Sequence, residues 1–123
     1  YAEMLGKKMT EHKVNVWMIN TGWRGGPYGV GKRMKLDYTR AMITAALEGQ
    51  LDNISYEEHP VFGMLMPTEC PNVPTEILKP RNTWADKDAY DTMSKNLAQQ
   101  FIKNFEKYAS GANEEILAAA PKV

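Results

Sequence analysis

The sequence predicts an α/β fold, and three features of its patterning favour that class. The chain opens in a helical pattern, with Ala2, Leu5 and Met9 at i, i+3 and i+7. An apolar run from Val14 to Ile19 follows, rich in β-branched and aromatic residues, as is typical of a strand buried on both faces. A long amphipathic helix is indicated near the C-terminus, so we expect helices layered on a sheet.

Glycine is concentrated in the segment that follows the apolar run, TGWRGGPYGVGKR. It holds five of the nine glycines of the chain, with Pro27 among them. Such a loop can adopt positive φ angles and can bring backbone amides close to a ligand.

Helical spacing resumes at Asp37, a first-turn or capping residue, and we expect the helix to stop at Gly49. The segment from Ile54 to Met66 is read as one or two short strands, interrupted by Pro60 and Gly63.

Prolines between Pro67 and Arg81 limit regular structure there to a helical turn over residues 75–78. The long helix is expected to start near Asp86 and to end at Gly111. A last short helix is expected after Asn113, which can cap it. The stripe of the long helix that we interpret as core consists of Ala98, Phe101, Ile102, Phe105 and Tyr108.

Length and charge exclude several classes of protein. A chain of 123 residues allows one domain with one modest core. Fifteen basic residues balance fifteen acidic ones, so no global field favours nucleic acid or an anionic membrane. No apolar run approaches the ~18 residues of a membrane span, and no signal peptide is visible. We therefore expect a soluble protein with neither nucleic acid nor membrane as a partner.

The first residue is Tyr1, and the helical pattern begins at once. We expect a segment of a longer polypeptide, and a processed mature N-terminus is the alternative. A segment cut from a sheet leaves edges and apolar faces uncovered, so we expect the isolated piece to fold weakly.

Positive charge gathers between Arg24 and Arg40, where Asp37 is the single acidic residue. This stretch joins the glycine loop to a helix N-terminus, where free amides and the helix dipole favour phosphate or carboxylate. A solvated basic loop whose glycines serve only a turn is the alternative, and the pattern alone favours neither. The cations are Arg24, Lys32, Arg33, Lys35 and Arg40.

Other motifs point to no chemistry. Gly26, Gly31 and Lys32 match the start of a phosphate-binding P-loop, but Arg33 stands where that motif needs Ser or Thr. Two separated histidines do not make a metal site. Cys70 has no evident activating base, so we expect a buried or inert thiol.

A family resemblance is carried by separated blocks that occur in order along essentially the whole chain. They are NTGW at 20–23, GGPYGVGKRM at 25–34, YTRAMI at 38–43, LDN at 51–53, PNVPTEIL at 71–78, PRNTW at 80–84 and AAAPKV at 118–123. Together they resemble the C-terminal part of ATP-dependent phosphoenolpyruvate carboxykinase.

The resemblance implies that residues 1–123 are the C-terminal segment of a kinase-like nucleotide-binding domain, with helices packed on a mixed sheet. The full enzyme of that family converts oxaloacetate and ATP to phosphoenolpyruvate, ADP and carbon dioxide, in gluconeogenesis or in reverse. The P-loop, the ligands of a divalent metal (Mg²⁺ or Mn²⁺) and the oxaloacetate-binding arginine are then expected upstream, in the remainder of the polypeptide. The segment alone is expected to be inactive.

By the family pattern, three residues contact ATP. Arg33 acts by charge near the phosphates or base, Met34 adjoins it, and Thr39 contacts the adenine end. The usual Arg-Ile pair reads Arg33-Met34 here, a conservative change if the neighbour contributes backbone and apolar surface. Lys32 and Lys35 are interpreted as a general positive field.

A different class of function also fits this architecture, namely a non-catalytic ligand- or protein-binding α/β module. A G-x-x-x-x-G-K-[ST] loop after a strand upstream of Tyr1 would favour the enzyme. An unrelated domain there would favour the module.

Overall fold

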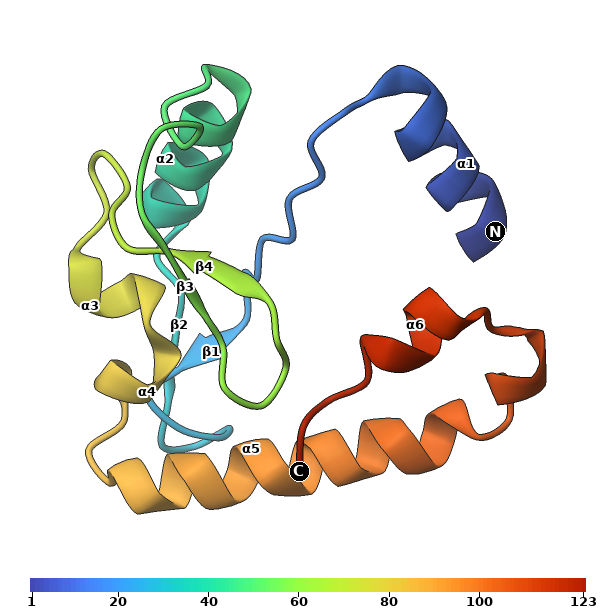
Figure 1. Cartoon of the computed structure of the whole chain (residues 1–123). Coiled ribbons are helices and arrows are strands. Elements are labelled where there is room, and N and C mark those ends of the chain that lie inside the picture. Colours follow the sequence, from blue (N-terminus) through green and yellow to red (C-terminus); the bar gives the residue numbers. More distant parts are fainter.

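A computed structural model describes all 123 residues as an open arrangement of helices with two short β-hairpins (Figure 1). The first helix, α1 (Ala2–His12), has no buried residue and stands away from the other elements at the end of an extended linker. No helix is long and apolar enough to span a membrane. The helix expected at the start of the chain is present, but none of its residues is buried.

The glycine-rich loop joins two very short strands, β1 (Trp23–Arg24) and β2 (Lys32–Arg33), which pair antiparallel. The helix α2 (Leu36–Leu47) follows β2 directly. The predicted stop at Gly49 is confirmed, since this residue has φ of 72° and the Gln50 N–H donates to the Ala45 carbonyl at 2.9 Å. That bond is the mark of a helix closed by a left-handed glycine.

The second hairpin consists of β3 (Tyr56–Glu58) and β4 (Leu65–Pro67), with Tyr56 opposite Pro67. Its turn contains Pro60 and Gly63, and Gly63 has φ of 68°. The expectation of two short strands interrupted at these residues is confirmed.

The rest of the chain is helical. After α3 (Thr75–Leu78) and α4 (Pro80–Thr83), the Asp86 carboxylate accepts the Ala89 N–H at 3.0 Å and begins α5 (Lys87–Phe105). The expectation that Gly111 ends this helix is wrong. The backbone tightens after Phe105 into 3₁₀-type turns, and Gly111 closes the short 3₁₀ helix η1 (Ala109–Gly111) instead.

The last helix, α6 (Glu114–Ala118), begins as expected. The Asn113 side chain accepts the Ile116 N–H at 2.9 Å and so caps the first turn. After α6 the chain returns to the second hairpin, where the Lys122 N–H donates to the Val61 carbonyl at 2.7 Å.

Two expectations about β-structure are wrong. Residues 14–19 do not form a strand, and no mixed sheet exists, because the β-structure consists of two separate two-stranded antiparallel sheets. A strand requires a neighbour to bond its N–H and C=O groups. Neither hairpin pairs with residues 14–19, so the segment is extended without being a strand. The fold is thus a mixture of helices with small sheets.

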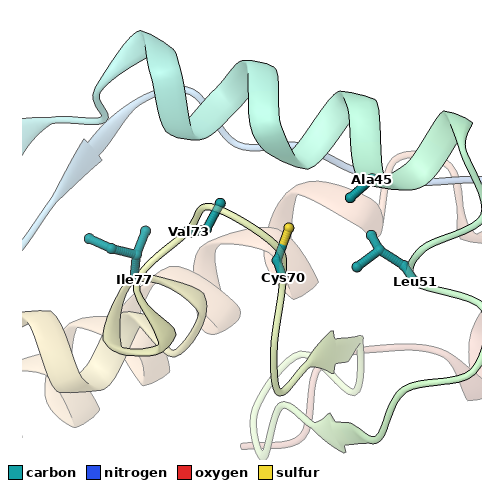
Figure 2. Packing of buried hydrophobic residues seen from close by; sticks show 5 residues of the cluster. All are labelled: Ala45, Leu51, Cys70, Val73 and Ile77. Carbon is teal, nitrogen blue, oxygen red and sulfur yellow. The ribbon is translucent and has the colours of Figure 1, made fainter.

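The core is small and lies between α2 and the segment that leads into α3. Figure 2 shows that its side chains converge from these two parts and from the loop after α2. Trp17, Met34 and Tyr38 pack against it from outside. Only 10 of 123 residues are buried, and no large side chain is fully buried. The cluster consists of Ala45, Leu51, Cys70, Val73 and Ile77.

The stripe that we interpreted as core extends past the end of α5 to Tyr108 and is buried only in part. Ala98 is fully buried, whereas Phe101 is 54% exposed and Tyr108 is 62% exposed. Phe101 meets the ring of Phe62 edge to face, with ring centres 6.2 Å apart. The helix therefore touches the second hairpin along one side and leaves much apolar surface uncovered.

This small core predicts that the isolated 123-residue chain unfolds gradually. Stability and cooperativity depend on buried apolar surface, which is scarce here. Urea unfolding followed by far-UV circular dichroism should give a broad transition with a shallow slope. A single steep transition, coincident with the one seen by tryptophan fluorescence, would contradict this expectation.

Candidate functional site

The glycine-rich hairpin carries the residues that the sequence singles out. The Pro27 carbonyl accepts the N–H groups of Val30 and Gly31, at 3.0 and 2.8 Å, so the loop closes on itself. A Cβ atom on Gly25 would lie 2.9 Å from the Thr83 carbonyl oxygen, which shows how closely the loop backs onto α4. The loop connects two antiparallel strands, unlike the strand–loop–helix of a P-loop.

The hairpin leads straight into the N-terminus of α2. The Met34 N–H donates to the Gly22 carbonyl at 2.9 Å, which ties the end of β2 to the start of β1. Lys35 occupies the N-cap position of α2, and no side chain caps the first turn. The positive end of the α2 dipole therefore lies next to β2, and no side chain of the N-cap residue accepts a hydrogen bond from the first-turn N–H groups.

The cations around this junction are uncompensated. The ion pairs of the structure are Lys7–Glu11, Lys79–Glu57, Arg81–Asp91 and Lys122–Glu58, and none involves a residue between 24 and 40. The Lys35 Nζ lies over the Tyr38 ring, 5.6 Å from its centre. The five basic residues of this stretch thus have no ion-pair partner, in a chain of zero net charge.

The three residues expected to contact nucleotide, Arg33, Met34 and Thr39, lie close in sequence, from the end of β2 into the first part of α2. Arg33 is exposed on β2, where it pairs with Trp23 and has no hydrogen bond or ion pair through its side chain. Met34 is half-buried and packs on the core cluster. Thr39 is 7% exposed, within α2. The guanidinium therefore faces outward while its two companions face inward.

Arg24 is a residue whose environment the sequence did not reveal. It lies on β1, it is half-buried, and its Nε is buried without a hydrogen-bond partner. An unpartnered buried donor is costly, and a cationic one more so. In the sequence Arg24 counts only as one of several positive charges, because its burial depends on how the hairpin packs.

A second polar cluster surrounds His59. This side chain is 6% exposed, and its Nδ1 accepts the N–H groups of Val61 and Phe62, both at 3.2 Å. Its Nε2 lies 2.9 Å from the Tyr90 hydroxyl of α5. Because Nδ1 must accept, the proton is on Nε2. Burial lowers the pKa of His59. The pairing spans 31 residues of sequence, so no local pattern could reveal it.

A cavity of about 480 Å³ adjoins His59, and of the charged side chains that line it only Lys95 lacks an ion pair. Lys79 binds Glu57 at 2.9 Å, and Arg81 holds Asp91 through two bonds of 2.8 and 3.0 Å. The hydrogen bond from Arg81 lowers the pKa of Asp91. Neither Arg33 nor Thr39 lines this cavity. The cluster therefore joins β3 and α4 to α5 and leaves little charge free for a ligand.

Glu57, Glu58 and Cys70 have structural roles. Glu57 and Glu58 bind lysines from different segments, Lys79 and Lys122, in agreement with side chains that point to opposite faces of a strand. Cys70 is buried as expected, and burial raises the pKa of its thiol. No group of three or more His, Cys, Asp or Glu side chains is arranged to hold a metal ion.

Comparison with known proteins decides the family. The family model of phosphoenolpyruvate carboxykinase matches residues 1–76. This chain belongs to that family. The protein named phosphoenolpyruvate carboxykinase (ATP) from Flavobacterium johnsoniae is 64% identical over 121 residues, which are 98% of this chain and 23% of that protein.

Two further carboxykinases extend the comparison. The one from Christiangramia forsetii is 60% identical over 98% of this chain, and the one from Brevibacillus brevis is 58% identical over all of it. The chain spans about 23% of the length of each of these relatives. The resemblance inferred from the sequence blocks is confirmed, including the helices beyond residue 76.

The hydrogen bonds of His59 predict how its ring titrates. Because burial lowers the pKa of His59 from 6.5, the ring should protonate below that pH. The neutral His59 ring contributes fully to the stability of the fold above about pH 6.5, and this contribution declines as the pH falls below 6.5. An NMR titration should show a low midpoint at the His59 ring, repeated at the amides of Val61 and Phe62. His59→Asn, which keeps an acceptor near Nδ1, should abolish these steps. A midpoint of 6.5 or above would contradict the geometry.

The packing of the glycine loop predicts the effect of Gly31→Ala. A Cβ atom there would overlap the Gly26 carbonyl group and lie 2.8 Å from the Arg24 carbonyl oxygen. Displacing these backbone atoms should destabilise the hairpin by about 1–3 kcal/mol. Amide chemical shifts should change throughout residues 22–34. Gly6→Ala is the matched control, since a Cβ atom on Gly6 meets nothing within 4 Å. Equal, purely local shift changes in both variants would refute the prediction.

Proposed function

We propose that residues 1–123 are the C-terminal segment of the nucleotide-binding domain of an ATP-dependent phosphoenolpyruvate carboxykinase. The whole enzyme converts oxaloacetate and ATP to phosphoenolpyruvate, ADP and carbon dioxide. Family membership supports this reaction. The observation that carries the nucleotide-binding role is the group of unpaired cations between Arg24 and Arg40, beside the uncapped N-terminus of α2.

Each proposed contact uses what the residue has free. Arg33 has no partner in the chain, so its guanidinium is available for charge-assisted bonds to phosphate oxygens or to a base edge. The Met34 N–H is committed to Gly22, so Met34 offers its carbonyl and thioether to the nucleotide. Thr39 is only 7% exposed within α2, so its proposed contact with the adenine end is through the small part of the residue that is exposed. Lys32 and Lys35 raise the local potential without a specific bond.

The rest of the chemistry is assigned to polypeptide outside this chain. ATP supplies the γ-phosphoryl group that is transferred to the enolate oxygen left by decarboxylation. The side chains present here do not fit a divalent metal, because no three potential ligands converge. We place the P-loop, the ligands of Mg²⁺ or Mn²⁺ and the oxaloacetate-binding arginine in the remainder of the polypeptide. The segment alone should have no turnover, and the enzyme should be cytoplasmic.

Arg33→Ala in the intact enzyme tests the nucleotide contact. Loss of a charge-assisted bond of about 1.5–3 kcal/mol should weaken ATP binding by about 10- to 150-fold. Isothermal titration calorimetry measures the affinity, and the melting temperature should hardly change because Arg33 is exposed. Lys32→Ala is the matched control, since it removes a charge from the same two-residue strand. We expect it to weaken binding by less than about threefold, the scale of a screened surface charge.

Equal affinities of the Arg33→Ala variant and the unaltered enzyme would refute the assignment of Arg33. The reaction is tested separately. The intact protein is assayed for carbon dioxide release from oxaloacetate and ATP in the presence of Mg²⁺ or Mn²⁺. If it binds ATP but releases no carbon dioxide, the carboxykinase hypothesis is refuted and the chain is a non-catalytic ligand-binding module.

A further inference from the structure

The cavity beside His59 has the size of a site for a small organic molecule. Its volume is about 480 Å³, and it lies where the second hairpin, α4 and the first turns of α5 come together (Figure 1). Sites for small ligands fall in this range of volumes. Val61, Met66 and Pro80 give it apolar lining, and the polar lining includes three residues of α5. Those three residues each have a hydrogen-bond donor that the chain does not use.

The first donor is the hydroxyl of Tyr90. His59 Nδ1 accepts two backbone N–H groups, so Nε2 carries the proton and donates it to the Tyr90 oxygen at 2.9 Å. The hydroxyl hydrogen of Tyr90 is then left without an acceptor in the chain. A hydroxyl that already accepts a hydrogen bond is polarised into a stronger donor. Tyr90 is therefore prepared to donate to a bound acceptor.

The second donor is the hydroxyl of Ser94, one helical turn after Tyr90 on the same face of α5. Ser94 lines the cavity and is only 7% exposed, yet its side chain forms no hydrogen bond within the chain. A helical hydroxyl can bond the carbonyl four residues earlier, as Thr10 does with Gly6, but Ser94 does not. A buried hydroxyl without a partner costs free energy, which a bound acceptor would recover.

The third donor is the ammonium group of Lys95, which has no ion pair. The carboxylates that line the cavity are already bound to other cations, and Arg81 holds both oxygens of Asp91, the carboxylate one turn before Lys95. The three ion pairs are Lys79–Glu57, Arg81–Asp91 and Lys122–Glu58. The lining, together with Lys122, therefore has an excess of one positive charge.

We propose that this cavity is a binding site for a small organic monocarboxylate. Its carboxylate oxygens accept hydrogen bonds from Tyr90, Ser94 and Lys95, which lie within residues 90–95 of one helix. Its apolar part lies against Met66 and Pro80. One negative charge matches the excess positive charge. A polyanion would instead be repelled by the carboxylates of the lining, and inorganic phosphate has no apolar part to bury.

A ligand in this place would contact the second hairpin and α5 at the same time. It would thus reinforce the junction that the bond between His59 and Tyr90 makes. Neither Arg33 nor Thr39 lines the cavity, so carboxylate binding here and the proposed nucleotide contact can be tested independently.

Titration of the intact carboxykinase with butyrate tests the proposal. Saturation-transfer difference NMR detects such weak ligands, and we expect a dissociation constant below about 30 mM, in keeping with the affinity that small ligands achieve per atom. Butyramide has the same shape without the charge and should bind at least about fivefold more weakly. Acetate lacks two methylene groups and should bind at least about threefold more weakly. No binding of butyrate, or binding of either analogue as tight as that of butyrate, would overturn the proposal.

Substitutions in the intact enzyme locate the bound butyrate. Lys95→Gln should weaken its binding at least about fivefold, and Ser94→Ala about two- to tenfold. Lys103→Gln is the matched control, since Lys103 is an exposed lysine of the same helix that does not line the cavity. It should change the affinity less than about twofold. If Lys95→Gln binds butyrate as tightly as Lys103→Gln does, the carboxylate binds elsewhere and the proposal fails.

Competition at constant ionic strength distinguishes a carboxylate site from a phosphate site. Inorganic phosphate should displace butyrate only with an inhibition constant above the dissociation constant of butyrate. An inhibition constant equal to or below that value would assign the cavity to phosphate and overturn the carboxylate.

Discussion

The close packing of α2 on the segment from Cys70 to Ile77 holds the central part of this molecule together. Ala45 is fully buried at that contact, and its small side chain allows the two segments to approach (Figure 2). Trp17 and Met34 attach to the same cluster from outside. The extended segment and the hairpin that carries Arg33 are therefore placed by one small core. A larger residue at position 45 would separate its two halves.

Charge is distributed in two different ways over this framework. Around the second hairpin, basic residues are paired with carboxylates, and the pairs join β3, α4 and the C-terminal segment. At the first hairpin, the basic residues have no acidic partner, although Asp37 lies among them. Since the chain has no net charge, this division comes from placement and not from composition. It is the physical basis of our proposal that the first hairpin binds an anion.

The open shape follows from how little apolar surface the chain can cover by itself. Helix α1 stands apart from the other elements (Figure 1) and has no buried residue, and α5 leaves Met93, Leu97 and Phe101 about half exposed. Exposed apolar area of this kind usually marks an interface.

The sequence by itself determined the local elements and the family. Asp86 and Asn113 cap helices, Gly49 ends one, and the break at Pro60 and Gly63 divides two strands, because each effect acts over a few residues. Only the tertiary structure decided that residues 14–19 have no backbone hydrogen-bond partners and that the buried Arg24 Nε has none either. The hydrogen bond between His59 and Tyr90 was likewise visible only in the structure. These features depend on contacts between distant segments, and hydrophobic periodicity predicts that a face is buried without indicating which surface covers it.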